Sequence, residues 1–264
     1  MSDKYKNHLI LSGSSIKEAL ALLNTLSQDA IIFIVNADEK LLGALTDGDI
    51  RRGFLKGFDT LSKIDSIIEK KPKYIYLNEI NLTKIISFRE NGYKIIPIVN
   101  EKLQILDLIN FRKVRSYLPI DAVIMAGGEG KRLRPLTNKT PKPLLKIGEK
   151  TIIEHNLDRL SSFGIEDFWI SINYLGEKIE KHLNYDSRIR FIKEDTPLGT
   201  IGAITKIKKF RSEYILLTNS DLLTNIDYEK FFKDFIDRDS DFAVLTIPYK
   251  INVPYAVLET LNGN

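Results

Sequence analysis

The stretch Val123-Ile-Met-Ala-Gly-Gly-Glu-Gly-Lys-Arg-Leu-Arg-Pro-Leu-Thr137, followed by Thr140-Pro-Lys-Pro-Leu-Leu145, decides the fold of this chain. An apolar strand runs into a glycine turn, an arginine follows, and a lysine lies between two prolines a few residues later. Glycines let a backbone approach a bound group closely. This order of residues suits a backbone that wraps around a triphosphate and then places two cations on it.

The turn differs from two commoner phosphate-binding loops. A P-loop requires Gly-x-x-x-x-Gly-Lys-Ser/Thr, but Met125 stands at the first glycine and Arg132 at the Ser/Thr. The dinucleotide fingerprint requires a third glycine, where this chain has Leu133. The pattern Gly-Gly-x-Gly-x-Arg-Leu-x-Pro-Leu-Thr…Pro-Lys-Pro closely resembles that of the sugar-1-phosphate nucleotidyltransferases, which make nucleotide sugars.

The bulk composition bounds the class of protein. The chain has 264 residues, of which 43% are hydrophobic and 28% charged, as in ordinary globular proteins with one large or two smaller domains. Its formal net charge of +4 is too dilute to indicate a nucleic-acid surface. It has no cysteine, which excludes disulfides and thiol chemistry. No apolar run could span a bilayer or form a signal peptide, so we expect a cytoplasmic protein without a membrane partner.

Two segments in the first part of the chain share one pattern. Each predicts a helix, two strands and a second helix, at 15–27, 30–35, 41–45 and 47–55 and again at 82–91, 95–99, 103–106 and 108–115. A β-α-β-β-α unit that occurs twice resembles a pair of cystathionine-β-synthase (CBS) domains, here over roughly residues 8–117. The resemblance implies a regulatory or dimerisation module, and therefore a homo-oligomer that assembles through the CBS pair.

The first CBS-like repeat contains the motif Gly43-Ala-Leu-Thr-Asp-Gly-Asp49. In CBS domains a Thr and an Asp at the spacing of Thr46 and Asp49 contact the phosphate and ribose of a bound nucleotide, so the resemblance implies an adenine nucleotide here. The second repeat has Asp107 and Asn110 at these positions, and a carboxylate repels phosphate. We therefore expect at most one adenosine-type site, and a purely structural role for the pair stays open.

From Ile120 onward, strands alternate with helices. Pro119 prevents one continuous helix from crossing the junction between the two parts of the chain. Strands are predicted at 122–125, 167–172, 189–192, 214–218 and 242–248, and helices at 152–163, 176–183, 200–207 and 228–238. The alternation predicts an α/β domain with a Rossmann-like, doubly wound parallel sheet, whose ligands lie at the carboxyl ends of the strands. We place the CBS pair at 1–117 and the nucleotide-binding part of a nucleotidyltransferase domain at 118–264.

The resemblance implies in-line attack by a sugar-1-phosphate oxygen on the α-phosphorus of a nucleoside triphosphate, which releases pyrophosphate. Arg132 would bind the β- and γ-phosphates, and Lys142 the α-phosphate or the incoming sugar phosphate. Asp221, at the end of a strand, would hold a catalytic Mg²⁺. The nucleotide would also contact Ala126, Gly127, Gly128, Gly130, Gly199 and Thr200.

Base and sugar preferences are carried by two further segments. Glu194 stands where the family has a base-reading Gln or Glu, and a carboxylate matches the paired N1–H and N2–H₂ donors of guanine. We therefore favour GTP, with UTP or dTTP as the alternative. Tyr255 and Ala256 lie in a segment that resembles the hexose site, where the family usually has Gly instead of Ala256. By analogy with similar two-domain proteins, the sugar is glucosamine-1-phosphate or, second, mannose-1-phosphate.

The family has further functional residues beyond those present here. A second metal-binding Asp and a sugar-binding Glu-Lys pair are expected later than Asn264, where this sequence ends. We therefore expect a C-terminally truncated enzyme that binds nucleotide but turns over poorly. A non-catalytic protein that senses nucleotides through its CBS pair is the alternative.

Overall fold

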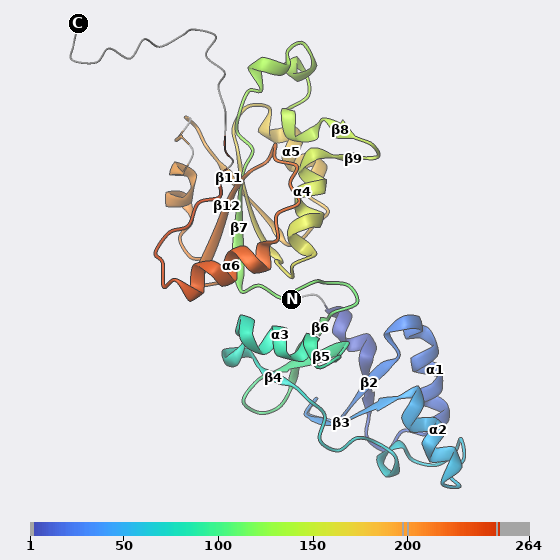
Figure 1. Ribbon diagram of the computed structural model, residues 1–264. Coiled ribbons are helices and arrows are strands. Elements are labelled where there is room, and N and C mark those ends of the chain that lie inside the picture. The colour runs from blue at the N-terminus through green and yellow to red at the C-terminus, as the bar shows by residue number, and fades with distance from the viewer. Residues whose placement is uncertain (1–2, 197, 200, 247, 249–264) are drawn as a thin grey trace, which may run out of the picture.

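The computed structural model describes residues 3–196, 198–199, 201–246 and 248 (Figure 1). The first part of the chain, drawn blue to cyan, contains two small three-stranded sheets. The second part, drawn green to red, contains one four-stranded sheet with helices packed against it. The change of architecture along the chain therefore follows the predicted order of elements.

The first repeat is a three-stranded sheet with two helices. Its elements are β1 (Leu9–Leu11), α1 (Ile16–Leu26), β2 (Ile31–Val35), β3 (Leu41–Thr46) and α2 (Asp47–Leu55). β1 pairs with β2 in parallel and β2 with β3 antiparallel. Both helices begin with a capping box, in which a hydroxyl and a carboxylate satisfy the free amides of the first turn. The predicted β-α-β-β-α unit is confirmed for this repeat.

The second repeat has the same sheet but lacks the last helix. Its elements are β4 (Ile75–Tyr76), α3 (Leu82–Glu90), β5 (Ile95–Val99) and β6 (Ile105–Asn110). The helix predicted at 108–115 is wrong, because β6 continues through Asn110, which pairs with Ile95 of β5. Burial of Ile105 and Ile109 against β5 outweighs the helical pattern there. Asp107 and Asn110 therefore lie in a strand and not at the start of a helix.

The two repeats share a core. Phe33, Leu41 and Ala44 of the first repeat form one buried cluster with Ile95 and Val99 of the second. The backbone amide of Leu41 also donates to the carbonyl of Leu103 at 2.9 Å. The first part of the chain is thus one pseudo-symmetric body, with the arrangement of a CBS pair.

The sheet of the second part is parallel throughout, in the order β11-β10-β7-β12. Its strands are β7 (Ile120–Met125), β10 (Asp167–Ile172), β11 (Ile189–Lys193) and β12 (Tyr214–Asn219). The strand order reverses between β7 and β12, because the chain first moves from β7 to β10 and β11 and then returns to the other side of β7. In parallel α/β sheets such a reversal opens a crevice at the carboxyl ends of the strands.

The helices of the second part pack against one face of the sheet. α4 (Ile152–Ser161), α5 (Gly176–Leu183) and α6 (Tyr228–Asp237) bury apolar side chains in a cluster with the sheet. The 3₁₀ helix Gly202–Lys206 covers part of the other face, where a helix over 200–207 was predicted. A small hairpin, β8 (Lys146–Ile147) and β9 (Lys150–Thr151), precedes α4. Other 3₁₀ helices are Asp3–His8, Ser27–Asp29, Ile64–Ser66, Leu77–Glu79, Lys131–Leu133, Leu136–Asn138 and Lys142–Leu144.

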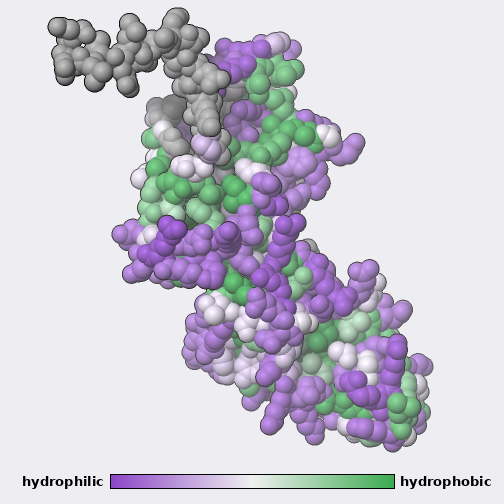
Figure 2. Space-filling model, viewed as in Figure 1, coloured by the Kyte–Doolittle hydropathy of each residue, from purple (hydrophilic) through white to green (hydrophobic). Residues whose placement is uncertain are grey.

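The strand predicted at 242–248 is wrong for the residues that can be described there. Residues 242–246 and 248 have no strand, and Phe242 is 72% exposed. A strand needs a pairing partner and a buried face, and these side chains have neither a ladder nor a core to join. Figure 2 shows apolar side chains gathered at the surface of the second part, above the hydrophilic band over α6.

The two parts of the chain are in direct contact through α3 and α6 (Figure 1). Leu82 and Ile86 of α3 pack into the main apolar cluster of the second part. Arg89 of α3 makes two hydrogen bonds of 2.7 Å to the carboxylate of Glu229 in α6. No helix within the described residues is long and apolar enough to cross a membrane.

Candidate active site

A cleft of about 650 Å³ opens at the carboxyl ends of β7 and β12. Three segments far apart in sequence meet there, namely the glycine turn, the Pro-Lys-Pro segment and the end of β12. Its lining residues are Met125, Gly127, Gly128, Glu129, Gly130, Lys131, Arg132, Leu133, Lys142, Pro143, Asn173, Glu194, Gly199, Asn219, Ser220 and Asp221. The cleft therefore lies where the reversal of strand order predicts a ligand site.

The glycine turn follows β7 and packs tightly at one point. Gly130 has a left-handed backbone with a φ of 62°. A Cβ at Gly130 would lie 3.0 Å from Thr137 Cγ2 and 3.2 Å from Lys142 Cβ. The hydroxyl of Thr137 donates to the carbonyl of Gly130 at 2.9 Å. The absence of a side chain at Gly130 thus allows the turn to approach Lys142 closely. At Gly128, in contrast, a Cβ would meet no atom within 4 Å.

The cations around the cleft differ in what they contact. Lys131 and Arg134 both pair with Glu129, at 3.3 and 3.0 Å. Lys142 pairs with Asp221 at 2.5 Å. Arg132 makes no hydrogen bond or ion pair with any residue that the structure describes. Arg132 is therefore the cation of this cleft that is available to an anionic ligand.

Asp221 lies in a loop that is held from two sides. The amide of the preceding residue, Ser220, donates to the carbonyl of Met125 at 3.0 Å, and Asn156 of α4 donates to the carbonyl of Ser220 at 2.9 Å. The described residues contain no group of three or more His, Asp or Glu that could hold a metal. A single carboxylate suits Mg²⁺ when substrate phosphates supply the other ligands. Asp221 therefore fits Mg²⁺ together with a bound triphosphate, not as a preformed metal cage.

Glu194 follows β11 and is only 8% exposed. Its Oε1 accepts a hydrogen bond from the hydroxyl of Ser171, and its Oε2 accepts one from the amide of Leu198 at 2.9 Å. Its backbone carbonyl accepts a hydrogen bond from Asn173 Nδ2 at 2.5 Å. Gly127 is the nearest part of the glycine turn, since a Cβ there would lie 3.8 Å from Oε1. The side chain is thus held in one orientation at the edge of the cleft.

The cleft brings together most of the residues that the sequence singles out. Arg132, Lys142, Asp221 and Glu194 line it, as do Gly127, Gly128, Gly130 and Gly199. Ala126 is buried behind the turn, where its amide donates to the carbonyl of Ser171 at 2.8 Å. Thr200, Tyr255 and Ala256 lie outside the described residues.

Sequence reasoning missed Asn173, Asn219 and Ser220, which also line the cleft. Each ends or directly follows a strand, β10 for Asn173 and β12 for the other two. The rule that directed attention to Asp221, a polar residue at the carboxyl end of a parallel strand, applies equally to them. Ser171 was missed as well, because it lies within a strand and its role depends on the position of Glu194.

The candidate CBS ligand residues have a structural use in this protein. The hydroxyl of Thr46 donates to Asp49 Oδ2 at 2.6 Å and accepts from the amide of Asp49, which caps α2. Arg52 pairs with the other oxygen of Asp49 at 2.5 Å. Neither Thr46 nor Asp49 lines this cleft or the second cavity described next.

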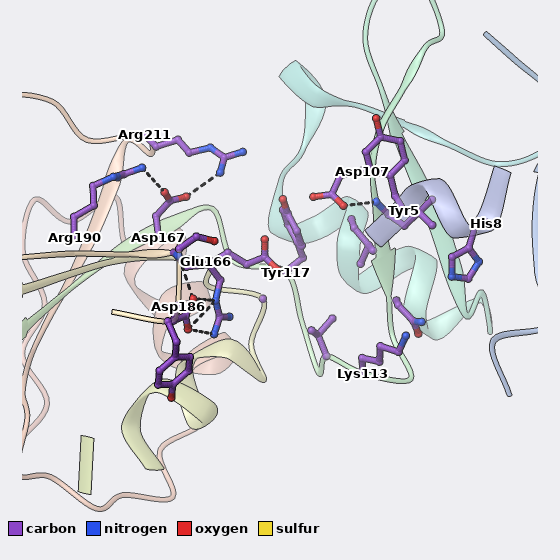
Figure 3. A pocket seen from close by; sticks show the side chains of 18 residues that line it. Tyr5, His8, Asp107, Lys113, Tyr117, Glu166, Asp167, Asp186, Arg190 and Arg211 are labelled. Atoms are coloured by element: carbon purple, nitrogen blue, oxygen red, sulfur yellow. Dashed lines mark hydrogen bonds and ion pairs between the residues drawn. The ribbon is translucent and has the colours of Figure 1, made fainter. Parts of the chain in front are cut away.

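A second cavity, of about 670 Å³, lies between the two parts of the chain (Figure 3). Asp107, Tyr117 and Asn110 line one wall; on the other, Asp167 accepts hydrogen bonds from Arg190 and Arg211. In the sequence of the second repeat, Asp107 argues against a phosphate ligand at this position. Nothing in the sequence indicates that the second part of the chain packs over Asp107.

Burial changes the acid–base properties of this cavity. It raises the pKa of Asp107 above the usual carboxyl value, and it raises the pKa of Tyr117 to about 12. Burial also raises the pKa of Glu166, to which the Asp107 carboxylate adds repulsion. These groups favour their protonated forms while the two parts of the chain are packed together.

The sequence profile of the nucleotidyl transferase family matches residues 121–256, just over half of the chain. The chain belongs to this family. A bifunctional protein GlmU of Methanococcus maripaludis is 30% identical over 142 residues, which are 53% of this chain and 32% of that protein. A mannose-1-phosphate guanylyltransferase catalytic subunit beta of Drosophila melanogaster is 34% identical over 145 residues, 52% of this chain and 39% of that protein.

A third relative covers more of its own length. The D-glycero-alpha-D-manno-heptose 1-phosphate guanylyltransferase of Aneurinibacillus thermoaerophilus is 33% identical over 135 residues, 50% of this chain and 59% of that protein. The chain thus spans between about a third and three fifths of the length of these three relatives.

Solved structures match the first part of the chain. The CBS domains of a transcriptional regulator from Streptococcus pneumoniae match with a TM-score of 0.35 and 15% identity, over 42% of this chain and 88% of that chain. A CBS domain protein from Pyrobaculum aerophilum complexed with AMP matches with a TM-score of 0.34 and 13% identity, over 39% of this chain and 79% of that chain. Because these scores are low, the description of the first part as a CBS pair rests on its two repeated sheets.

Proposed function

We propose that this protein transfers a nucleoside monophosphate, GMP from GTP in the first instance, to a hexose-1-phosphate and releases pyrophosphate. The observation that carries the proposal is that one cleft contains the Lys142–Asp221 ion pair and Arg132, which is unpaired among the described residues. A free cation, a displaceable cation and a carboxylate are what a triphosphate with its Mg²⁺ requires. The named relatives of the family, all sugar-1-phosphate enzymes or GlmU, support the reaction class.

The chain's residues act by neutralising and aligning two anionic reactants, because phosphoryl transfer of this kind needs no covalent nucleophile from the protein. Arg132 binds the β- and γ-phosphates and stabilises the leaving pyrophosphate, for which its planar fork is suited. Pro141 and Pro143 restrict the backbone on both sides of Lys142. In the proposed reaction, its ammonium group moves from Asp221 to the α-phosphate or the sugar phosphate. When bound, Mg²⁺ would be held by Asp221 and would offset the negative charge of the phosphates.

The glycine turn and two neighbouring segments bind the nucleotide. Gly127, Gly128 and Gly130 let the backbone approach the phosphates, with Ala126 behind them. Gly199 and Thr200, from the segment after Glu194, would also contact the nucleotide. In these segments, backbone amides can donate hydrogen bonds to the phosphates, and the glycines add no side chains that would crowd them.

Glu194 selects the base in this proposal. Its two oxygens match the two neighbouring donors of guanine, while uracil and thymine offer one donor beside acceptors that a carboxylate repels. Two of the named relatives are guanylyltransferases, which supports GTP. UTP or dTTP is the alternative. Tyr255 and Ala256 would contact the hexose, glucosamine-1-phosphate first and mannose-1-phosphate second.

Calorimetric titration with GTP, UTP, dTTP, CTP and ATP in the presence of Mg²⁺ tests the proposal independently of turnover. We expect one GTP-selective site that Arg132→Ala abolishes. Lys131→Ala is the matched control, because Lys131 lies in the same turn and lines the same cleft but is paired with Glu129. Equal GTP affinity in wild type and Arg132→Ala would refute the assignment. Pyrophosphate release with each sugar phosphate then identifies the acceptor.

A nucleotide-sensing role of the CBS pair is the second candidate, with an adenine nucleotide at Thr46 and Asp49 and assembly of a homo-oligomer through the pair. The capping box must open for this, because the Thr46 hydroxyl already bonds Asp49. ATP binding that Asp49→Asn abolishes and Arg132→Ala leaves intact would favour this role. ATP binding that Asp49→Asn does not change would exclude this site.

A further inference from the structure

We infer that Ser171 is a positioning residue for base selection, because its hydroxyl holds the Glu194 carboxylate in the orientation that the base meets. The inference rests on the proposed function, in which Glu194 contacts the base. It adds a residue that neither binds the nucleotide nor lines the cleft.

Ser171 stands where packing alone would place an apolar side chain. It is completely buried in β10, and its register partners are Met125 of β7 and Ile192 of β11. Side chains of register partners lie on the same face of a sheet, and both partners belong to the apolar cluster on that face. Burying a hydroxyl in such a place is unfavourable unless it is hydrogen-bonded. Its side-chain bond goes to Glu194 Oε1.

Two hydrogen bonds from described residues hold the carboxylate of Glu194, and Ser171 donates one of them. The Leu198 amide fixes Oε2, and Asn173 fixes the backbone carbonyl. The Leu198 hydrogen bond holds Oε2 alone, and a single hydrogen bond tolerates a range of carboxylate orientations. Rotation of the carboxylate about its terminal torsion is soft, because such torsions have broad energy wells. The Ser171 hydroxyl is therefore the contact that sets the plane of the carboxylate.

The orientation of this plane matters for recognition and not for phosphate binding. A carboxylate oxygen accepts two hydrogen bonds, so Oε1 and Oε2 each keep one for a ligand. Gly127 adds no side chain of its own beside Oε1, where a Cβ would lie 3.8 Å from this oxygen. Two parallel hydrogen bonds to guanine need the plane of the carboxylate to coincide with the plane of the base, whereas a single hydrogen bond to a base with one donor does not. Loss of the Ser171 hydroxyl should therefore reduce the preference for GTP and spare the binding of the triphosphate.

Ser171→Ala tests this inference, with Ser116→Ala as the matched control. Ser116 is also completely buried, and its Oγ has no hydrogen-bond partner among the described residues. Both changes remove one buried hydroxyl, but only one affects Glu194. The measurements are the dissociation constants for GTP, UTP and dTTP by calorimetry and the thermal unfolding of each apo variant. Glu194→Gln and the double variant with Ser171→Ala complete a cycle.

We expect Ser171→Ala to lower the preference for GTP over UTP by roughly tenfold, as for loss of a hydrogen bond to a charged group. Ser116→Ala should leave it unchanged, and Ser171→Ala should add no further loss in the Glu194→Gln background. An unchanged preference, an equal loss for all three nucleotides, or an additive loss in the double variant would overturn the inference.

Failure of the proposed function is visible before Ser171 is changed. A wild-type protein without base preference, or one whose preference survives Glu194→Gln, would remove Glu194 from base selection and overturn the inference with it. A wild-type preference that Glu194→Gln abolishes but Ser171→Ala retains would overturn the inference alone.

Discussion

Alanine at Gly130 should destabilise the protein, whereas alanine at Gly128 should leave stability nearly unchanged and weaken ligand binding. The φ of Gly130 is 62°, and a residue with a Cβ costs about 1–2 kcal/mol in this conformation. The added Cβ would also press on Thr137 and Lys142, at 3.0 and 3.2 Å. We expect Gly130→Ala to cost about 2 kcal/mol in total. At about 2–4 °C per kcal/mol for a body of this size, the melting temperature should fall by roughly 4–8 °C.

Gly128→Ala is the comparison, because the new methyl group would meet no protein atom within 4 Å. Its stability should stay within about 0.5 kcal/mol of wild type. In the proposed function this methyl group projects toward the nucleotide and weakens its binding. The assay is thermal unfolding of both apo variants, followed by calorimetric titration of GTP. Equal destabilisation by the two changes, or full stability of Gly130→Ala, would refute the reasoning about the turn.

Three further changes test other parts of the chain. Glu194→Gln should weaken the selection of GTP over UTP in calorimetric titrations; unchanged selectivity would contradict the base assignment. Burial raises the pKa of Asp107 in the folded protein. The contribution of this carboxyl group to the free energy of unfolding is therefore fully present below the ordinary carboxyl pKa, and it is lost as the pH rises through the raised pKa. Asp107→Asn, whose amide oxygen can still accept from the Leu108 amide, should therefore raise the melting temperature at pH 7, and a decrease would argue against a costly buried charge. A double-mutant cycle of Arg89→Ala and Glu229→Ala should give a coupling of about 1 kcal/mol in chemical unfolding, and additive effects would show that the ion pair contributes nothing.

Local sequence determined those elements whose boundary signals agree with their periodicity. The helix Asp47–Leu55 was predicted to the residue, because Thr46 and Asp49 form a capping box ahead of it. The strands Ile95–Val99 and Asp167–Ile172 were also predicted to the residue, because each is an apolar run bounded by polar or turn residues. In these segments local propensity and tertiary packing favour the same structure.

The two wrong elements fail for reasons outside their own sequence. The segment 108–115 has a helical pattern, but Asn110 pairs across to Ile95 and the strand continues. The segment 242–248 is an apolar run like that of a buried strand, but its described residues find no neighbouring strand. Pairing is a property of the partner as much as of the segment, so a single-sequence pattern cannot supply it.

The site follows the same division. Arg132, Lys142 and Asp221 could be predicted, because a motif and the rule for strand ends mark them, and the structure places all three in one cleft. Ser171 could not, since a serine within a predicted strand gives no sign of a buried partner 23 residues away. The cavity around Asp107 could not be predicted either, because it is formed by two parts of the chain whose contact is tertiary.

That contact also decides how independent the two parts are. Leu82 lies in the first part by sequence, yet it is buried in the apolar cluster of the second. Arg89, about two turns further along α3, donates hydrogen bonds to Glu229 of α6 and to the carbonyl of Arg115 in the connecting segment. Separation of the two parts would therefore expose apolar surface, which is unfavourable, and would break the ion pair between Arg89 and Glu229. Because α6 follows directly on the loop that contains Asp221, the surface that holds the CBS pair in place is also part of the framework that holds the candidate active site.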